Sequence, residues 1–196
     1  MKYFTKLFLP LFLTFDLASA SEQLILIVSV DFNNTHGVLS RYEKQQERFR
    51  QVGEKVRVNL GRNGLAWGIG ESGFSPKIGE PVKKEGDGRA PAGIFKISKA
   101  FGYAPKIKTR MPYLQADKEL ICVDDSQSDS YNKIININES DDPKSFEWMR
   151  RDDHLYKIGL VIEHNRKAVK GAGSCIFFHI RKSEGTPTAG CSAMRE

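Results

Sequence analysis

The sequence predicts a mostly β domain with one to three short helices. Short segments rich in β-branched and aromatic residues recur along the chain, and such segments are typical of strands. Glycine- and proline-containing stretches lie between them, as expected for turns and loops. Apolar residues at helical spacing form only one clear segment, so the pattern as a whole favours sheets.

The first predicted strands lie in the N-terminal half. Residues 24–30 (LILIVSV) are short and β-branched, and residues 55–60 (KVRVNL) alternate strictly between polar and apolar side chains. Residues 92–98 (AGIFKIS) follow a Gly/Pro turn. We expect long loops at 61–81 and 83–93, whose glycines would let the backbone approach a ligand closely.

Three further strands are predicted in the C-terminal half. They cover residues 131–137 (YNKIINI), 155–163 (LYKIGLVIE) and 174–180 (SCIFFHI). The last segment is apolar on both faces, which predicts a central position in a sheet.

The segment DDPKSFEWMRR carries the clearest helix signal. Asp141 or Asp142 can cap a helix, and Pro143 suits its first turn. Phe146 and Met149 then fall at helical spacing. We therefore expect a short helix here.

The N-terminal segment MKYFTKLFLPLFLTFDLASA has the form of a secretory signal peptide. Lys2 and Lys6 precede an apolar run, and the segment ends in the small-x-small sequence Ala-Ser-Ala. The run is too short to span a bilayer. We expect cleavage after Ala20, no stable membrane insertion afterwards, and one domain over residues 21–196 in the periplasm or cell envelope.

The net charge of +6 comes from basic residues that are scattered along the chain. An ordinary basic surface explains this, and nucleic acid is not an expected partner of an exported protein. If the charge has a function, anionic wall polymer or lipid headgroups are its expected partners.

The three cysteines predict one disulfide and one free thiol, because an exported chain enters an oxidising compartment. Cys122 lies in the apolar stretch ELICV and Cys175 in CIFF, so both can face a core from strands. Cys191 follows Thr-Ala-Gly in a loop. The economical pairing is Cys122 with Cys175, which leaves Cys191 free.

His179 and Cys191 can together perform covalent chemistry. Eleven residues separate them, which suits a strand, a turn and a return. A cysteine attacks as a thiolate, so it needs a nearby base, which His179 can supply. If residues 192–196 begin a helix, its N-terminal amides would lower the pKa of the thiol and hold an oxyanion, while Gly190 lets a carbonyl come close.

The run HIRKSEGTPTAGC resembles the active-site segment of the L,D-transpeptidase catalytic domain family (YkuD-like). In that family a histidine on a strand precedes a [Ser/Thr]-x-Gly-Cys loop, and Thr188, Gly190 and Cys191 fit this loop. The upstream segments that resemble a divergent branch of the family, in the same order, are GRNGLAWG, KKEGDGRAPAGIF, CVDD, YN, EHN and GSCIFFHI. The likeness covers nearly the whole chain after the leader.

The resemblance implies a single β-sandwich or barrel domain that acts on peptidoglycan stem peptides. Cys191 would attack the carbonyl of the third residue, expel the terminal D-alanine and leave a thioester. His179 would move the proton, oriented by the Gly190 carbonyl, and amides at or beside Cys191 would hold the oxyanion. An amine acceptor gives a cross-link, whereas water gives an L,D-carboxypeptidase; no metal or organic cofactor is implied.

The sequence differs from the common family motif at two positions. Ala189 stands where the family has histidine, and Ala193 where it has arginine. Arg181 or Arg195 could supply the missing charge. The family continues with a closing helix and strand, so we expect either an abbreviated domain or a longer chain. The resemblance and the spacing together suggest as substrate-binding residues Arg89, Tyr131, Asn132, His164, Arg181 and Thr188.

Other classes of site remain as alternatives. A zinc site could use Cys175, His179, His164 and Cys191, but Cys175 and His179 would lie about 13 Å apart along one strand. A papain-like peptidase has its cysteine before its histidine, and a sortase needs an arginine well downstream of the cysteine. A non-catalytic wall-binding module stays open, since Ala189 and Ala193 could mark a lost activity.

Overall fold

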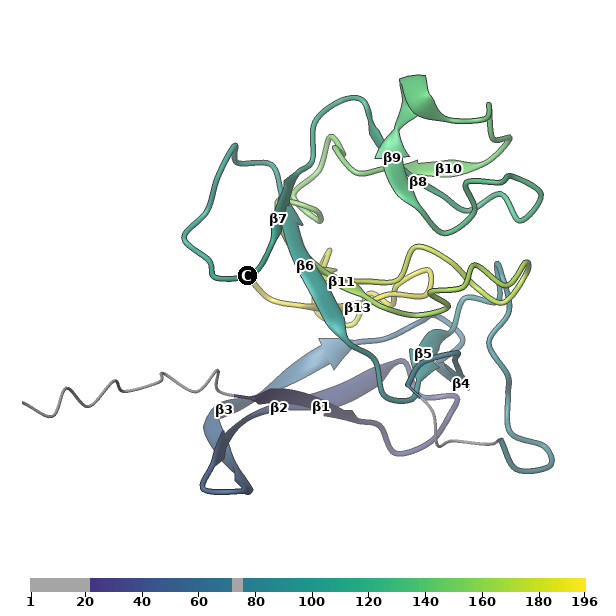
Figure 1. Cartoon of the computed structure of the whole chain (residues 1–196). Helices are drawn as coiled ribbons and strands as arrows, with labels where there is room; N and C mark the ends of the chain where they lie inside the picture. Colours follow the sequence, from purple (N-terminus) through teal and green to yellow (C-terminus); the bar gives the residue numbers. More distant parts are fainter. Residues whose placement is uncertain (1–21, 72–75) are drawn as a thin grey trace, which may run out of the picture.

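The computed structural model describes residues 22–71 and 76–196, and its fold is mostly β as predicted. The expected signal peptide, residues 1–20, lies outside the described residues. The strands form one large sheet, a three-stranded sheet and a two-stranded pair (Figure 1).

The large sheet has eight strands and carries the C-terminal segment at its centre (Figure 1). In sheet order the strands are β1 (Gln23–Val28), β2 (His36–Gln45), β3 (Arg48–Asn59), β13 (Ser192–Met194), β12 (Phe177–Ile180), β11 (Ile158–Ile162), β6 (Ile97–Gly102) and β7 (Tyr113–Gln115). Two neighbouring pairs, β12 with β13 and β6 with β7, are parallel, and the others are antiparallel. The order runs from β1 to β7 without closing, so the described strands form no barrel.

The three-stranded sheet lies beside the large one and is antiparallel throughout (Figure 1). Its order is β10 (Phe146–Trp148), β8 (Leu120–Val123) and β9 (Ile134–Asn136). The parallel pair β4 (Leu65–Trp67) and β5 (Ala90–Ala92) is separate.

The predicted strands differ in how well their bounds agree with the structure. Residues 131–137, 155–163 and 174–180 each contain one strand, and residues 24–30 overlap β1, which begins one residue earlier. Residues 55–60 are the end of the much longer β3. The segment 92–98 lies mostly between β5 and β6, so this prediction is only partly confirmed.

The predicted helix over DDPKSFEWMRR is wrong. The Asp141 carboxylate accepts hydrogen bonds from the Ser128 hydroxyl and the Asp129 amide, so it does not cap a helix of its own segment. Residues 146–148 form β10, where Phe146 pairs with Val123 of β8. Tertiary pairing with β8 overrides the helical spacing. The described residues contain a single helical turn, the 3₁₀ turn η1 (Ile137–Glu139).

The main core lies between the three-stranded sheet and the middle of the large sheet. Its centre is an aromatic cluster of Phe101, Tyr156 and Phe177, with ring centroids 5.2 to 5.6 Å apart and edge-on contacts. Cys191 belongs to the same buried cluster.

The predicted disulfide between Cys122 and Cys175 is confirmed, with the two Cα atoms 5.9 Å apart. Cys122 lies on β8, and Cys175 lies two residues before the start of β12. The bond therefore joins the three-stranded sheet to the centre of the large one, across the core.

No helix within residues 22–71 and 76–196 has the length and apolar character needed to cross a lipid bilayer.

Candidate active site

The Cys191 sulfur is held by the backbone that leads into β12. It accepts a hydrogen bond from the Phe177 amide at 3.3 Å, and its thiol donates to the Cys175 carbonyl at 3.6 Å. The residue is 8% exposed, and it is the free cysteine of the described chain. The thiol thus lies just below the surface, at the start of β13.

The loop before Cys191 is fixed by Thr188. The Thr188 hydroxyl donates to the Cys191 carbonyl at 2.6 Å and accepts from the Gly190 amide at 3.2 Å. The Thr188 amide in turn donates to the Leu60 carbonyl at 2.8 Å, next to the end of β3. This single side chain therefore sets the shape of the turn that presents the thiol.

His179 lies on the same face of the sheet as the thiol. The parallel register pairs His179 with Ala193, so Cys191 is level with Phe177, about 7 Å along the strand from His179. The imidazole Nδ1 donates to the Ile180 carbonyl at 2.7 Å, which leaves Nε2 as the basic nitrogen. This carbonyl takes the orienting role that the resemblance implied for Gly190.

Burial makes both groups neutral in the free protein. It lowers the pKa of His179, which is 9% exposed, so the imidazole is uncharged near neutral pH. Burial is also the main reason that the pKa of the Cys191 thiol is raised to about 12, and the charge of Glu147 adds to it. The Phe177 amide acts in the opposite direction. The site therefore contains a neutral base and a protonated nucleophile.

The expected helix over residues 192–196 is wrong, because Ser192–Met194 form β13. The Ala193 position pairs with Asn59 of β3 on one side and with β12 on the other. Backbone hydrogen bonds to strands on both sides stabilise this segment, so it is more stable as a strand than as an isolated helical turn. A helix dipole consequently does not act on the thiol.

Both groups line one open cleft of about 940 Å³. The nucleophile loop contributes Thr188, Ala189 and Gly190 to its wall. The charged side chains around it include Arg62, Lys83, Glu85, Asp124, Glu147, Arg150, Arg151, Asp152, Asp153 and Lys182. A cleft of this size can take a peptide of several residues.

One wall of the cleft holds a tyrosine–carboxylate pair that the sequence did not reveal. Tyr156 is 2% exposed, and its hydroxyl donates to the Glu147 carboxylate at 2.6 Å. Its ring contacts the His179 imidazole edge-on, with centroids 5.2 Å apart. Burial raises the pKa of the Glu147 carboxyl, while the Tyr156 hydrogen bond opposes this.

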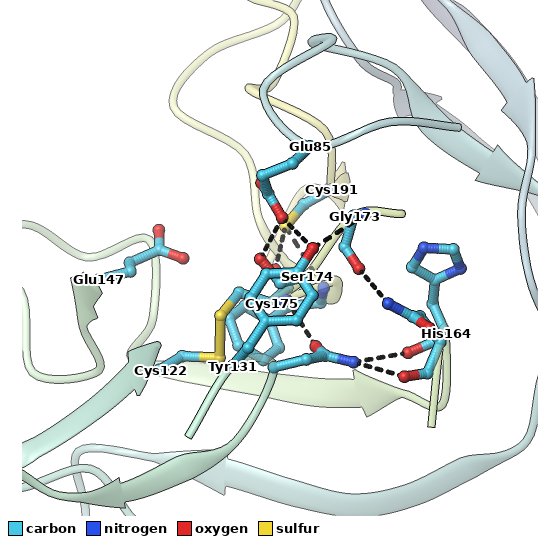
Figure 2. Close-up of a disulfide and its surroundings, with 12 residues drawn as sticks. Glu85, Cys122, Tyr131, Glu147, His164, Gly173, Ser174, Cys175 and Cys191 are labelled. Carbon is cyan, nitrogen blue, oxygen red and sulfur yellow. Dashed lines mark hydrogen bonds between the residues drawn. A yellow bond between two sulfur atoms is a disulfide. The ribbon is translucent and has the colours of Figure 1, made fainter. Parts of the chain in front are cut away.

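Glu85 also lines the cleft and is hydrogen-bonded to residues beside the disulfide (Figure 2). One of its carboxylate oxygens accepts from the Tyr131 hydroxyl at 2.5 Å and from the Ser174 hydroxyl at 2.6 Å. Lys83 lies close by, with its side chain 5% exposed and its ammonium 2.6 Å from Asp87. Lys83, Glu85 and Asp87 belong to the predicted loop 83–93, but no pattern in the sequence singled them out.

Two of the predicted substrate-binding residues lie outside the lining of the cleft and form hydrogen bonds with the backbone beside it. Tyr131 is fully buried, donates to Glu85 and accepts from the Gly173 amide at 3.0 Å. The Asn132 side chain donates to the carbonyls of His164 and Asn165 and accepts from the Cys175 amide (Figure 2). Their contacts are with the protein, so they position the backbone of residues 173–175, which leads into β12.

Of the remaining four, Thr188 lines the cleft, whereas Arg89, His164 and Arg181 lie outside its described lining. The Arg89 guanidinium donates to the carbonyls of Phe32 and Leu65, at 2.9 and 2.8 Å. His164 is 2% exposed and its Nε2 lies 3.0 Å from the Ala172 carbonyl. Arg181 pairs with Glu184 at 3.6 Å. The substrate-binding role of Arg89, His164 and Arg181 therefore stays a prediction, and their described contacts are with other parts of the protein.

The zinc alternative loses one of its ligands. Cys175 is bonded to Cys122, so it cannot act as a thiolate ligand. No other group of three or more histidine, cysteine or acidic side chains gathers at metal-binding distance in the described part of the chain.

Comparisons with family models, with curated proteins and with solved structures gave no match to this chain.

Proposed function

We propose that this chain is an exported L,D-transpeptidase-like cysteine acyltransferase that acts on peptidoglycan stem peptides. The observation that carries the proposal is the position of the free Cys191 thiol and the neutral His179 imidazole on one face of the sheet, in one open cleft. The resemblance of the nucleophile loop and of the upstream segments supports the substrate class.

The proposed reaction begins with proton transfer. His179 Nε2 takes the proton of the Cys191 thiol, and the thiolate attacks the carbonyl of the third stem-peptide residue. The C–N bond to the terminal D-alanine breaks, and the histidine returns the proton to the leaving amine. A thioester between the stem peptide and Cys191 remains.

The neutral state of both groups suits such a sequence. A buried thiol with a raised pKa is not a nucleophile at rest, so it is protected from adventitious alkylation and oxidation. A histidine whose pKa is lowered keeps its Nε2 lone pair available at mildly acid pH. Activation then depends on a substrate that brings the thiol and the imidazole into contact.

The second half-reaction decides the product. An amine of a neighbouring stem peptide gives a cross-link, and water gives a tripeptide. Because both acceptors attack the same thioester, product analysis separates the transpeptidase from the L,D-carboxypeptidase.

Intact mass spectrometry tests the proposal. The protein with its disulfide formed is incubated with a disaccharide tetrapeptide, and separately with a carbapenem, beside Cys191→Ala and His179→Ala. We expect an adduct on the parent protein, none on Cys191→Ala, and much slower formation on His179→Ala. His154→Ala serves as the matched control, because His154 is exposed and its ring nitrogen lies 3.2 Å from the Arg181 carbonyl, on the protein surface.

The absence of any adduct on a folded protein with a free Cys191 thiol would overturn the catalytic proposal. The chain would then be better described as a non-catalytic wall-binding module. Binding of intact peptidoglycan sacculi without turnover would be the positive sign of that function.

A further inference from the structure

The cations that line the cleft fall into two groups, according to whether the protein itself provides a partner for them. They are Arg62, Lys83, Arg150, Arg151 and Lys182. The Lys83 ammonium lies 2.6 Å from Asp87. The Arg151 guanidinium lies 2.9 Å from Asp153. The Arg150 guanidinium lies over the Tyr103 ring, 4.2 Å from its centroid, and donates to the Tyr103 carbonyl. These three cations therefore have partners within the fold.

Arg62 and Lys182 make up the second group. Both side chains are exposed, and neither charged group forms a hydrogen bond, ion pair or ring contact with another residue of the described chain. Arg62 follows the end of β3, and Lys182 follows the end of β12. The segments that carry these two charges lie on either side of the loop that leads to Cys191.

Thr188 connects the backbone of Arg62 to that of Cys191. The Arg62 amide donates to the Thr188 carbonyl at 2.8 Å. The Thr188 hydroxyl donates to the Cys191 carbonyl at 2.6 Å. Arg62 is therefore fixed beside the loop that presents the thiol, and both residues line the same cleft.

The Arg62 side chain lies across Gly88. A Cβ atom at Gly88 would be 2.9 Å from Arg62 Nε and 3.0 Å from its Cγ and Cζ atoms. Gly88 also has a φ of +67°, which side chains rarely adopt. The next residue, Asn63, donates from its amide to the Gly88 carbonyl at 3.0 Å, so the two loops are joined here. The bare backbone at Gly88 thus leaves room for the guanidinium and gives it a surface to pack on.

A guanidinium group without a protein partner suits a carboxylate ligand. Its planar fork of N–H donors matches the two oxygens of a carboxylate, and such bidentate pairs are stronger than neutral hydrogen bonds. In the proposed reaction the thiol attacks the carbonyl of the third stem-peptide residue. The carboxylate of the fourth residue lies within about 4 Å of that carbonyl, because only one residue separates them. It must therefore lie beside the loop that Arg62 adjoins.

We propose that Arg62 binds the C-terminal carboxylate of the donor stem peptide, and so selects peptides in which a single residue with a free carboxylate follows the attacked carbonyl. The inference rests on the proposed function and assigns Arg62 as a substrate-binding residue. Lys182 adds a positive charge to the same region as a single ammonium group, without the planar fork of a guanidinium.

The first test measures binding by isothermal titration calorimetry, with Cys191→Ala as the background so that no covalent step occurs. The probes are a disaccharide tetrapeptide with a free terminal carboxylate and the same compound with a terminal carboxamide. We expect the acid to bind roughly 10- to 100-fold more tightly than the amide, as expected for a charge-assisted pair. Equal affinities for the two compounds would overturn the inference.

Replacing Arg62 tests whether this residue is the source of the preference. Arg62→Ala should weaken binding of the acid by the same factor and change binding of the amide less than about twofold, so the preference disappears. Arg62→Lys keeps the charge but loses the fork, so an intermediate preference is expected. Thermal unfolding checks that these substitutions at an exposed position leave the fold unchanged. A full preference for the acid in Arg62→Ala would contradict the assignment.

Lys182→Ala is the matched control, because Lys182 lines the same cleft and its replacement also removes one exposed positive charge. We expect it to weaken binding of the acid less than about threefold, since an exposed charge is screened by solvent and salt. The preference for the acid should remain. A loss of preference as large as that in Arg62→Ala would show a general positive field in place of a site at Arg62, and would overturn the inference.

The outcome for the inference is distinct from that for the proposed function. If adducts form on Cys191 of wild type but the acid and the amide bind alike, only the role of Arg62 is wrong. If the acid is preferred through Arg62 but no adduct forms, the carboxylate site stands and the acyltransferase proposal fails. If neither compound binds, both are wrong.

Discussion

The Phe177 amide donates a hydrogen bond to the Cys191 sulfur at 3.3 Å, across two adjacent parallel strands. The backbone of β12 therefore fixes the depth at which the thiol lies. An amide donor would stabilise a thiolate, but burial is the larger effect and the thiol stays protonated. This balance leads to the first prediction.

The stability of the protein should fall in alkaline solution because of Cys191. Its pKa is raised to about 12 in the folded state, whereas a free cysteine titrates near about 8.5. Between these values the unfolded chain loses the thiol proton and the folded chain keeps it, so the stabilising effect present below the lower pKa is lost as pH rises. At about pH 10.5 the loss should approach roughly 2 kcal/mol.

Urea unfolding of wild type and Cys191→Ala at about pH 8 and about pH 10.5 measures this effect. Titrations of groups that do not interact with Cys191 contribute equally to both proteins, so they cancel in the difference. An equal pH dependence in the two proteins would contradict the prediction.

The Cys122–Cys175 bond should contribute about 2 to 4 kcal/mol to the free energy of unfolding, as is typical of a disulfide that closes a long loop. Its two ends are 53 residues apart in the sequence. The double variant Cys122→Ser, Cys175→Ser should therefore unfold at lower urea. Adding a reductant should destabilise wild type and leave the double variant unchanged; the same response in both would show that another group is responsible.

Tyr131→Phe should destabilise the protein by about 1 to 3 kcal/mol. The substitution leaves the Gly173 amide without its acceptor and removes one of the donors to Glu85. Tyr113→Phe is the matched control, since its hydroxyl makes one hydrogen bond, to the Ala104 carbonyl, at an exposed site. Thermal unfolding of both variants tests whether the buried hydroxyl is the more costly one to remove.

Thr188→Val should slow adduct formation on Cys191 by roughly tenfold or more, while Thr188→Ser should retain most of the rate. Valine has nearly the shape of threonine but can neither donate to the Cys191 carbonyl nor accept from the Gly190 amide. The rate of the carbapenem reaction, followed by mass spectrometry, gives the comparison. If both variants react like wild type, the Thr188 hydroxyl does not shape the nucleophile loop.

The parts of this molecule that could be predicted from its sequence depend on local patterns. The apolar run 174–180 correctly indicated a central strand, because a strand covered on both faces is apolar at every position. The location of Cys122 and Cys175 in such stretches predicted their bond, which left Cys191 free.

The residues that could not be predicted depend on contacts between distant segments. Proline and the apolar spacing around Glu147 predict a helix, whereas pairing with β8 makes this segment a strand. Arg89 was read as a ligand for substrate, but only the fold shows that its guanidinium binds two backbone carbonyls. The sequence of a short polar segment does not indicate which distant residues its side chains will form hydrogen bonds with.

The bond from Cys122 to Cys175 joins two parts of the fold. One is the sheet that carries Glu147, and the other is the segment before β12 whose Cys175 carbonyl accepts a hydrogen bond from the Cys191 thiol. Such a bond forms where thiols are oxidised, and it does not persist in a reducing cytoplasm. In a chain exported as we propose, oxidation would then act as a maturation step. The nucleophile would be produced at once, but the sheet that forms one wall of its cleft would be linked to the segment before β12 only after arrival in the envelope.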